Sequence, residues 1–332
     1  MGGWLRMKIT DLAIVFVLIT LPFNLFLDIK TQNVEIASYK KIEINRILDT
    51  AVEDGVTNMI LGGAGKKVQI SKEDAVEGFL NSMYVNFNAL EESTAAMKLQ
   101  GYISCMVVMD YDGYYVISNQ EYYNSYGDKE MKLVSKPKQS FSYTYGDNVY
   151  IFTLDTNLTI LNLTTNEIMT GTRDQLVEKI GDSLSPDFLK DEILFDQLRR
   201  ETIIDNLKTD INYAINKHND VATQFGISYH FSLPTIPDQD WLKTVDDVGM
   251  LVFFQGMPIG VAGERINSYA LGGARIVKAA KYVIEDIEIS PGIVRKYYHK
   301  HDCEKIIDDS KVLDSKAECA GNGYMPCPHC NP

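Results

Sequence analysis

The chain has 332 residues, of which 45% are hydrophobic and 23% charged, with a formal net charge of −13 at pH 7. This length and apolar content allow one large core or two smaller ones, and they exclude a disordered chain. The acidic balance argues against a general nucleic-acid binder, because phosphate affinity depends on clustered Lys and Arg. We therefore expect no nucleic-acid partner.

Residues 12–27 form an apolar run without a charged side chain, bounded by Asp11 and Asp28. A helix of this length rises about 24 Å, a little under the roughly 30 Å of a bilayer core. The run predicts a transmembrane anchor over residues 12–27. A cleaved secretion signal and a buried core helix are the alternatives. No pair of small residues follows the run as a signal-peptidase site, which favours the anchor.

The charges around this run predict its orientation. Arg6 and Lys8 precede it, with only Asp11 against them. By the positive-inside rule, residues 1–11 form a short cytoplasmic lead, and the body lies outside the cell membrane. We thus expect a single-pass protein whose partners are the membrane and, through its N-terminal helix, other envelope proteins.

Residues 28–97 are predicted to form a helical stalk and a second helix. Apolar residues recur every three or four positions through residues 31–60, which continues the membrane helix. The glycine-rich stretch 61–67 ends it. Ser71 is placed to cap the second helix, with Asp74 three positions later.

Residues 98–290 are predicted to form an extracytoplasmic α+β domain. Residues 101–118 read as a hairpin that turns at Asp112 and Gly113, and the strand patterns that follow predict one sequential antiparallel sheet. Further strands are expected at 141–145, 149–154, 158–163, 226–234 and 250–256, helices at 173–180, 191–218 and 274–285, and glycine loops at 256–263 and 272–273. No recognisable nucleophile motif occurs, so the chain is not expected to be an enzyme.

The tail, residues 291–332, differs in chemistry from the rest of the chain, because four of the five cysteines lie in it. His299 and Cys303 are separated by three residues, and Cys327 and Cys330 by two. Two such pairs can close a tetrahedron of nitrogen and sulfur ligands, so we predict a Zn²⁺ site. Three alternatives stay open: His301 in place of His299, two disulfides among Cys303, Cys319, Cys327 and Cys330, and a redox Cys-x-x-Cys pair.

The tail resembles the small zinc-binding motif of Ada-type proteins, which is similar to a tail on some secreted thermonuclease-like proteins. The residues that carry this resemblance are Tyr298, His299, Cys303, Gly323, Tyr324, Pro326, Cys327, Cys330 and Pro332. The resemblance implies a zinc-binding segment. The Ada-type roles in methyl transfer and DNA binding do not carry over, because the tail is close to charge-neutral. A closed structural zinc knuckle is the expected form.

The N-terminal part resembles pilin-like envelope proteins of the tight-adherence type. The similarity lies in a short lead, one apolar helix that continues into a stalk, and an α+β domain outside. Pilins carry a processing site with a glutamate just inside the apolar run, whereas here Gly2 and Gly3 lie far upstream and Asp11 only borders the run.

These observations predict an α+β protein with a single N-terminal transmembrane helix and helical stalk, an antiparallel sheet flanked by helices, and a small C-terminal zinc knuckle. The function that fits this architecture is a structural or assembly component of a bacterial surface or secretion apparatus, of pilus-like or conjugation type. An extracellular ligand-binding sensor module is the first alternative. A zinc-tailed secreted nuclease or hydrolase is the second.

Overall fold

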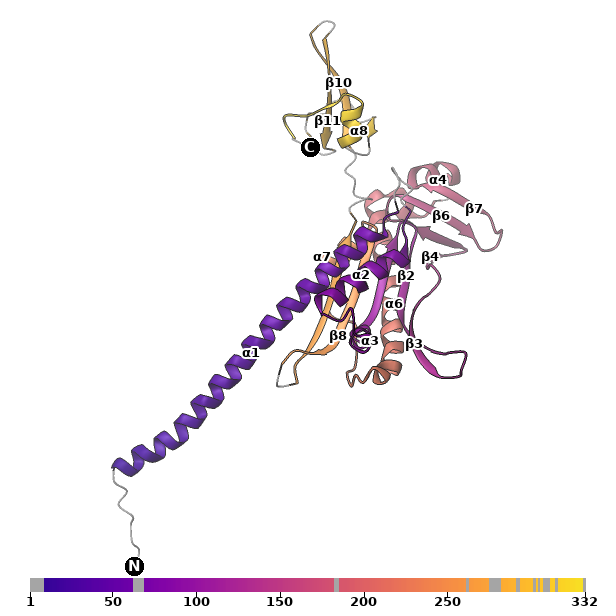
Figure 1. Ribbon diagram of the computed structural model, residues 1–332. Coiled ribbons are helices and arrows are strands. Elements are labelled where there is room, and N and C mark those ends of the chain that lie inside the picture. The colour runs from indigo at the N-terminus through magenta and orange to yellow at the C-terminus, as the bar shows by residue number, and fades with distance from the viewer. Residues whose placement is uncertain are drawn as a thin grey trace, which may run out of the picture.

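The computed structural model describes most of the chain and shows an α+β protein with a long N-terminal helix (Figure 1). The described residues are 9–61, 69–181, 185–260, 263–274, 282–290, 293–300, 303, 305–306, 311–313 and 316–330. Most of the predicted lead, most of the glycine-rich stretch 61–67, and His301 lie outside them.

The helix α1 (Ile9–Met59) joins the predicted anchor and stalk in one element of 51 residues. Such a helix is about 76 Å long, and it continues through Pro22. Its first part is exposed, as shown by Phe16 and Leu18, which are 65% and 68% exposed. From Ala37 onward one face becomes buried. The prediction that the helix continues beyond the apolar run is confirmed.

The second half of α1 packs against α2 (Lys72–Asn86) and a sheet. Leu48, Val52 and Val56 recur every four residues on the buried face, as expected of an amphipathic helix. At Gly55 the two helices approach so closely that a Cβ atom would lie 2.8 Å from the Ala75 carbonyl oxygen. This half of α1 is therefore part of the body's core.

The predicted cap of α2 is confirmed. Ser71 adopts an extended conformation and its hydroxyl accepts a hydrogen bond from the Asp74 backbone N–H at 3.1 Å. The cap satisfies one of the N–H groups that the first turn of a helix leaves without a partner.

A five-stranded antiparallel sheet, in the order β3-β2-β1-β8-β9, forms the centre of the body. Its strands are β1 (Ile103–Asp110), β2 (Gly113–Tyr123), β3 (Lys129–Ser135), β8 (Gly249–Pro258) and β9 (Arg265–Gly273). Neighbouring residues of a strand point to opposite faces. On one face, the Tyr114 hydroxyl donates a hydrogen bond to the Asp210 carboxylate of α6 (Glu192–Val221). On the other face, the Lys72 ammonium of α2 lies over the ring of Tyr115. The sheet is thus covered by α1 and α2 on one face and by α6 on the other.

A second antiparallel sheet of four strands, in the order β4-β5-β6-β7, joins the same core. Its strands are β4 (Phe141–Tyr145), β5 (Asn148–Phe152), β6 (Asn157–Asn162) and β7 (Ile168–Thr172). The strands predicted at 141–163 form a sequential antiparallel sheet as expected. The predicted hairpin at 101–118 does not belong to it, because β1 pairs with β8 from much later in the chain. Shorter elements complete the body: α3 (Ser93–Gly101), α4 (Arg173–Ile180), α5 (Asp187–Lys190), η1 (Ala222–Phe225) and α7 (Asp238–Thr244).

Three local predictions in the second half of the body are wrong. Residues 226–234 are not a strand, since the side-chain amide of Asn219 binds both the N–H and the carbonyl oxygen of Phe231 and takes the place of a strand partner. The loop predicted at 272–273 from its two glycines is instead the end of strand β9. The final helix expected at 274–285 is contradicted at residues 282–285, which belong to strand β10 (Tyr282–Ser290).

The C-terminal module has a small core of its own. β10 forms a hairpin with β11 (Ile293–Lys300), flanked by β12 (Val312–Leu313) and β13 (Met325–Pro326), and α8 (Lys316–Gly321) lies beside them. The buried residues Tyr282, Tyr298 and Cys319 form this core, separate from that of the body. The predicted domain boundary at residue 290 falls within the β10–β11 hairpin.

Candidate metal centre

The β10–β11 hairpin carries different chemistry on its two faces. Tyr282 and Tyr298 contribute to the small apolar core. Val283 lies directly opposite His299 in the register, so these two share the other face. This alternation points the imidazole of His299 away from the core and toward the cysteines that follow in the chain.

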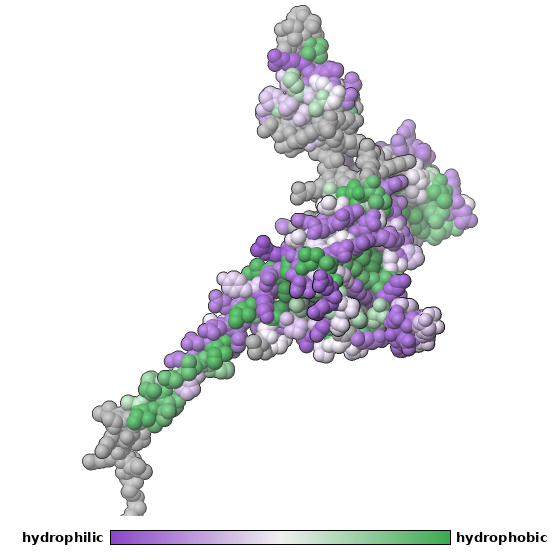
Figure 2. All heavy atoms as spheres, viewed as in Figure 1, coloured by the Kyte–Doolittle hydropathy of each residue, from purple (hydrophilic) through white to green (hydrophobic). Residues whose placement is uncertain are grey.

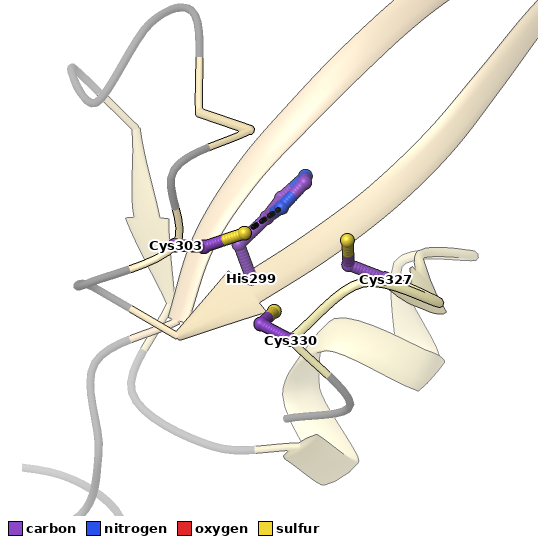
Figure 3. A group of neighbouring side chains, drawn as sticks. All are labelled: His299, Cys303, Cys327 and Cys330. Carbon is purple, nitrogen blue, oxygen red and sulfur yellow. Dashed lines mark hydrogen bonds between the residues drawn. The ribbon is translucent and has the colours of Figure 1, made fainter.

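Four side chains converge on this face of the hairpin (Figure 3). One ligand atom from each of His299, Cys303, Cys327 and Cys330 lies within 4.8 Å of all the others. Nδ1 of His299 is 3.4 Å from Sγ of Cys303. In a tetrahedral site with metal–sulfur bonds of about 2.3 Å, two sulfur ligands are about 3.8 Å apart. A contraction of about 1 Å at the widest pair would bring the group to that geometry.

The two cysteines of the Cys-x-x-Cys pair are held in place by backbone hydrogen bonds. The Cys327 N–H donates to the Tyr298 carbonyl oxygen at 3.0 Å, which extends the pairing of β13 with β11. The His329 N–H donates to Sγ of Cys327 at 3.4 Å within the tight turn that leads to Cys330. The turn therefore positions both sulfurs on one side of the backbone.

The same turn favours the thiolate of Cys327. Burial alone would raise the pKa of this thiol, but the backbone N–H groups of Cys330 and His329 hydrogen-bond its sulfur, and contacts with the Cys330 and Cys303 side chains add to this. The pKa of Cys327 is lowered as a result. A thiolate is the form of cysteine that binds metal ions.

Glu285 on β10 is a component of the site that the sequence reasoning missed. Its Oε2 lies 3.3 Å from Nε2 of His299, and both side chains are buried. The two atoms are in close contact but do not meet hydrogen-bond geometry. The pattern-based reasoning placed Glu285 at the end of a helix; reading residues 282–285 as a strand would have put it on the face of His299.

The structure brings together all four of the predicted ligands. No disulfide joins the five cysteines, each of which lies within the described part of the chain. Cys319 is buried in α8 as part of the apolar core. The alternative ligand His301 lies outside the described residues.

Comparison of the chain with protein-family models, with curated proteins and with solved structures found no match. Three sulfur atoms and one imidazole nitrogen, largely buried and close enough to share one ion, form a cluster that could hold a metal ion.

Proposed function

We propose that this chain is a membrane-anchored, extracytoplasmic structural or assembly component of a bacterial surface or secretion apparatus, with a structural zinc site in its C-terminal module. The observation that carries the proposal is the continuity of α1. One helix presents an exposed apolar surface over its first part and enters the core of the body with its last part.

The exposed part of α1 has the properties of a membrane span. An 18-residue window has a mean hydropathy of 1.9 and none of it is buried in the protein. Figure 2 shows this apolar surface on the half of the helix that extends away from the body. Soluble monomers rarely expose so large a contiguous apolar surface, so lipid or other membrane helices are the natural partners.

The rigidity of the connection supports a structural role. A flexible linker would let the body rotate freely above the membrane, whereas a continuous helix fixes the body's orientation to within the tilt of its anchor. Arg6 and Lys8 before the span favour a cytoplasmic N-terminus and an extracytoplasmic body.

The donor set supports zinc as the metal. Three thiolates and one imidazole are typical of structural Zn²⁺ sites. Four protein ligands fill a tetrahedron and leave no position for a substrate or an activated water. Zinc here would stabilise the module and would not perform catalysis.

Topology and partners are tested on intact cells. External protease should degrade the body while the span is protected, and complete protection would reverse the proposed topology.

A photo-crosslinking residue in place of the exposed Leu25 should give discrete protein adducts. The same residue in place of Tyr126, which is 89% exposed on the body, serves as the control. Adducts to lipid alone at Leu25 would contradict a role in assembly.

The metal is tested on the full chain purified in detergent. Elemental analysis should find about one zinc per chain, as one closed site requires, and Cys327→Ser should lose it. Cys105→Ser is the matched control, because Cys105 is buried in β1 of the body. Wild-type protein that contains no zinc and does not take it up after reduction would overturn this assignment.

A further inference from the structure

We propose that Glu285 is a positioning residue that fixes which ring nitrogen of His299 binds the metal. The inference rests on the proposed metal site. Nδ1 of His299 faces Sγ of Cys303 at 3.4 Å, while Nε2 faces Oε2 of Glu285 at 3.3 Å. One nitrogen of the ring thus lies next to a cysteine sulfur, and the other lies next to a carboxylate.

The chemistry of the imidazole ring gives this arrangement its consequence. A neutral histidine carries one proton, and the nitrogen without it is the one that binds a metal ion. A carboxylate next to Nε2 stabilises the tautomer with the proton on Nε2, because only that form can donate a hydrogen bond to it. Nδ1 is then left with its lone pair directed at the cysteines.

Strand pairing explains how the carboxylate reaches the ring. Val283 is the direct cross-strand partner of His299, and Glu285 lies two residues further along β10 on the same face. Such a diagonal neighbour is within reach of a long side chain. The first strand of the module, which supplies no ligand, thereby controls the histidine on the second.

The imidazole of His299 and the carboxylate of Glu285 are both buried, which strengthens the interaction between them. The side chains of His299 and Glu285 are 2% and 5% exposed, so water competes poorly for either. A carboxylate buried at this position would be costly without a donor. A histidine that bound zinc through Nδ1 would carry its proton on Nε2, and this N–H would be a donor for the carboxylate.

The test uses the full chain in detergent, loaded with zinc or with ¹¹³Cd²⁺ and labelled with ¹⁵N on its histidines. The variants are Glu285→Ala, which removes the acceptor, and Glu285→Gln, which keeps an acceptor oxygen but removes the charge. Asp286→Asn is the matched control, because the exposed Asp286 lies next to Glu285 on the opposite face of β10, where its partner is Tyr324 and not His299.

Wild type should show cadmium coupling to Nδ1 of His299 and a protected proton on Nε2. Glu285→Ala should weaken metal affinity about 10- to 100-fold in competition with a chelator, with loss of the protected proton. Glu285→Gln should keep Nδ1 coordination with intermediate affinity, and Asp286→Asn should match wild type. Glu285→Ala should also give cadmium coupling to Nε2 in part of the protein, because neither ring nitrogen is then favoured, and a change in fold alone would not exchange one ring nitrogen for the other as ligand.

Two results would contradict different claims. Wild-type protein that binds neither metal would overturn the metal site itself. Wild-type protein that binds metal through Nε2, or a Glu285→Ala protein with wild-type affinity and an unchanged Nε2 proton, would overturn the role of Glu285 while leaving the metal site intact.

Discussion

The substitution Leu48→Ala tests whether the second half of α1 is an integral part of the body. Leu48 is 1% exposed on the face of α1 that packs into the main core. The substitution removes three carbon atoms, worth about 2.4 kcal/mol at about 0.8 kcal/mol per buried methylene group. The cavity adds to this, so we expect a loss of about 2–5 kcal/mol in the free energy of unfolding.

The matched control is Leu18→Ala, the same change on the same helix, because Leu18 is 68% exposed. Equilibrium unfolding by denaturant in detergent would be followed by the fluorescence of Trp241, which is 3% exposed in the body. Trp4→Phe in every protein leaves Trp241 as the sole tryptophan. Leu18→Ala should leave the midpoint unchanged. Equal midpoints for the two alanine variants would refute the placement of α1 in the core.

Two further predictions concern the module and the pH dependence of the body. Removal of metal by a chelator should unfold the C-terminal module, because among the described residues its core consists of three buried side chains, and it should leave the unfolding of the body unchanged. Hydrogen exchange measures both, and a shared transition would contradict separate cores. Burial lowers the pKa of His218 from 6.5 to about 4, although its hydrogen bond to the Gly101 carbonyl oxygen opposes this shift. The unfolded chain therefore takes up this proton first as the pH falls, and stability should decrease between about pH 6.5 and pH 4 by up to about 3 kcal/mol. In denaturant titrations His218→Gln should show a shallower decline over this window, and an identical decline would contradict the shift.

Elements with strong local signals were predictable from the sequence. Helix α4 begins and ends where its pattern predicts, since Thr172 and Gln175 form a capping box and Gly181 follows its last residue. Strand β4 likewise matches its alternating pattern. The residues of the candidate metal site were predictable as two pairs, because the spacings His299/Cys303 and Cys327/Cys330 are local features. The pairing of β13 with β11 brings the two pairs together.

Features that depend on distant partners were not predictable. The extended stretch around Phe231 has strand-like alternation, yet the side chain of Asn219 satisfies its backbone. Tyr282–Ser290 has apolar spacing compatible with a helix at its start, and only pairing with β11 makes it a strand. Glu285 was missed for the same reason, because its role depends on strand pairing.

The cysteines of the body and of the C-terminal module differ in their surroundings, and this difference matters if the protein faces an oxidising exterior as proposed. The body holds its one cysteine, Cys105, fully buried in a central strand, and burial raises the pKa of this thiol, which suppresses its reactivity. The module instead gathers three cysteines at one point, where an oxidising exterior would favour a disulfide between Cys327 and Cys330. A metal ion bound to the sulfurs would prevent this, and the burial of Cys303 and Cys327 limits access to them. In the proposed compartment, metal uptake would have to precede exposure to oxidant, and a residue such as Glu285 that tightens binding would also protect the thiolates.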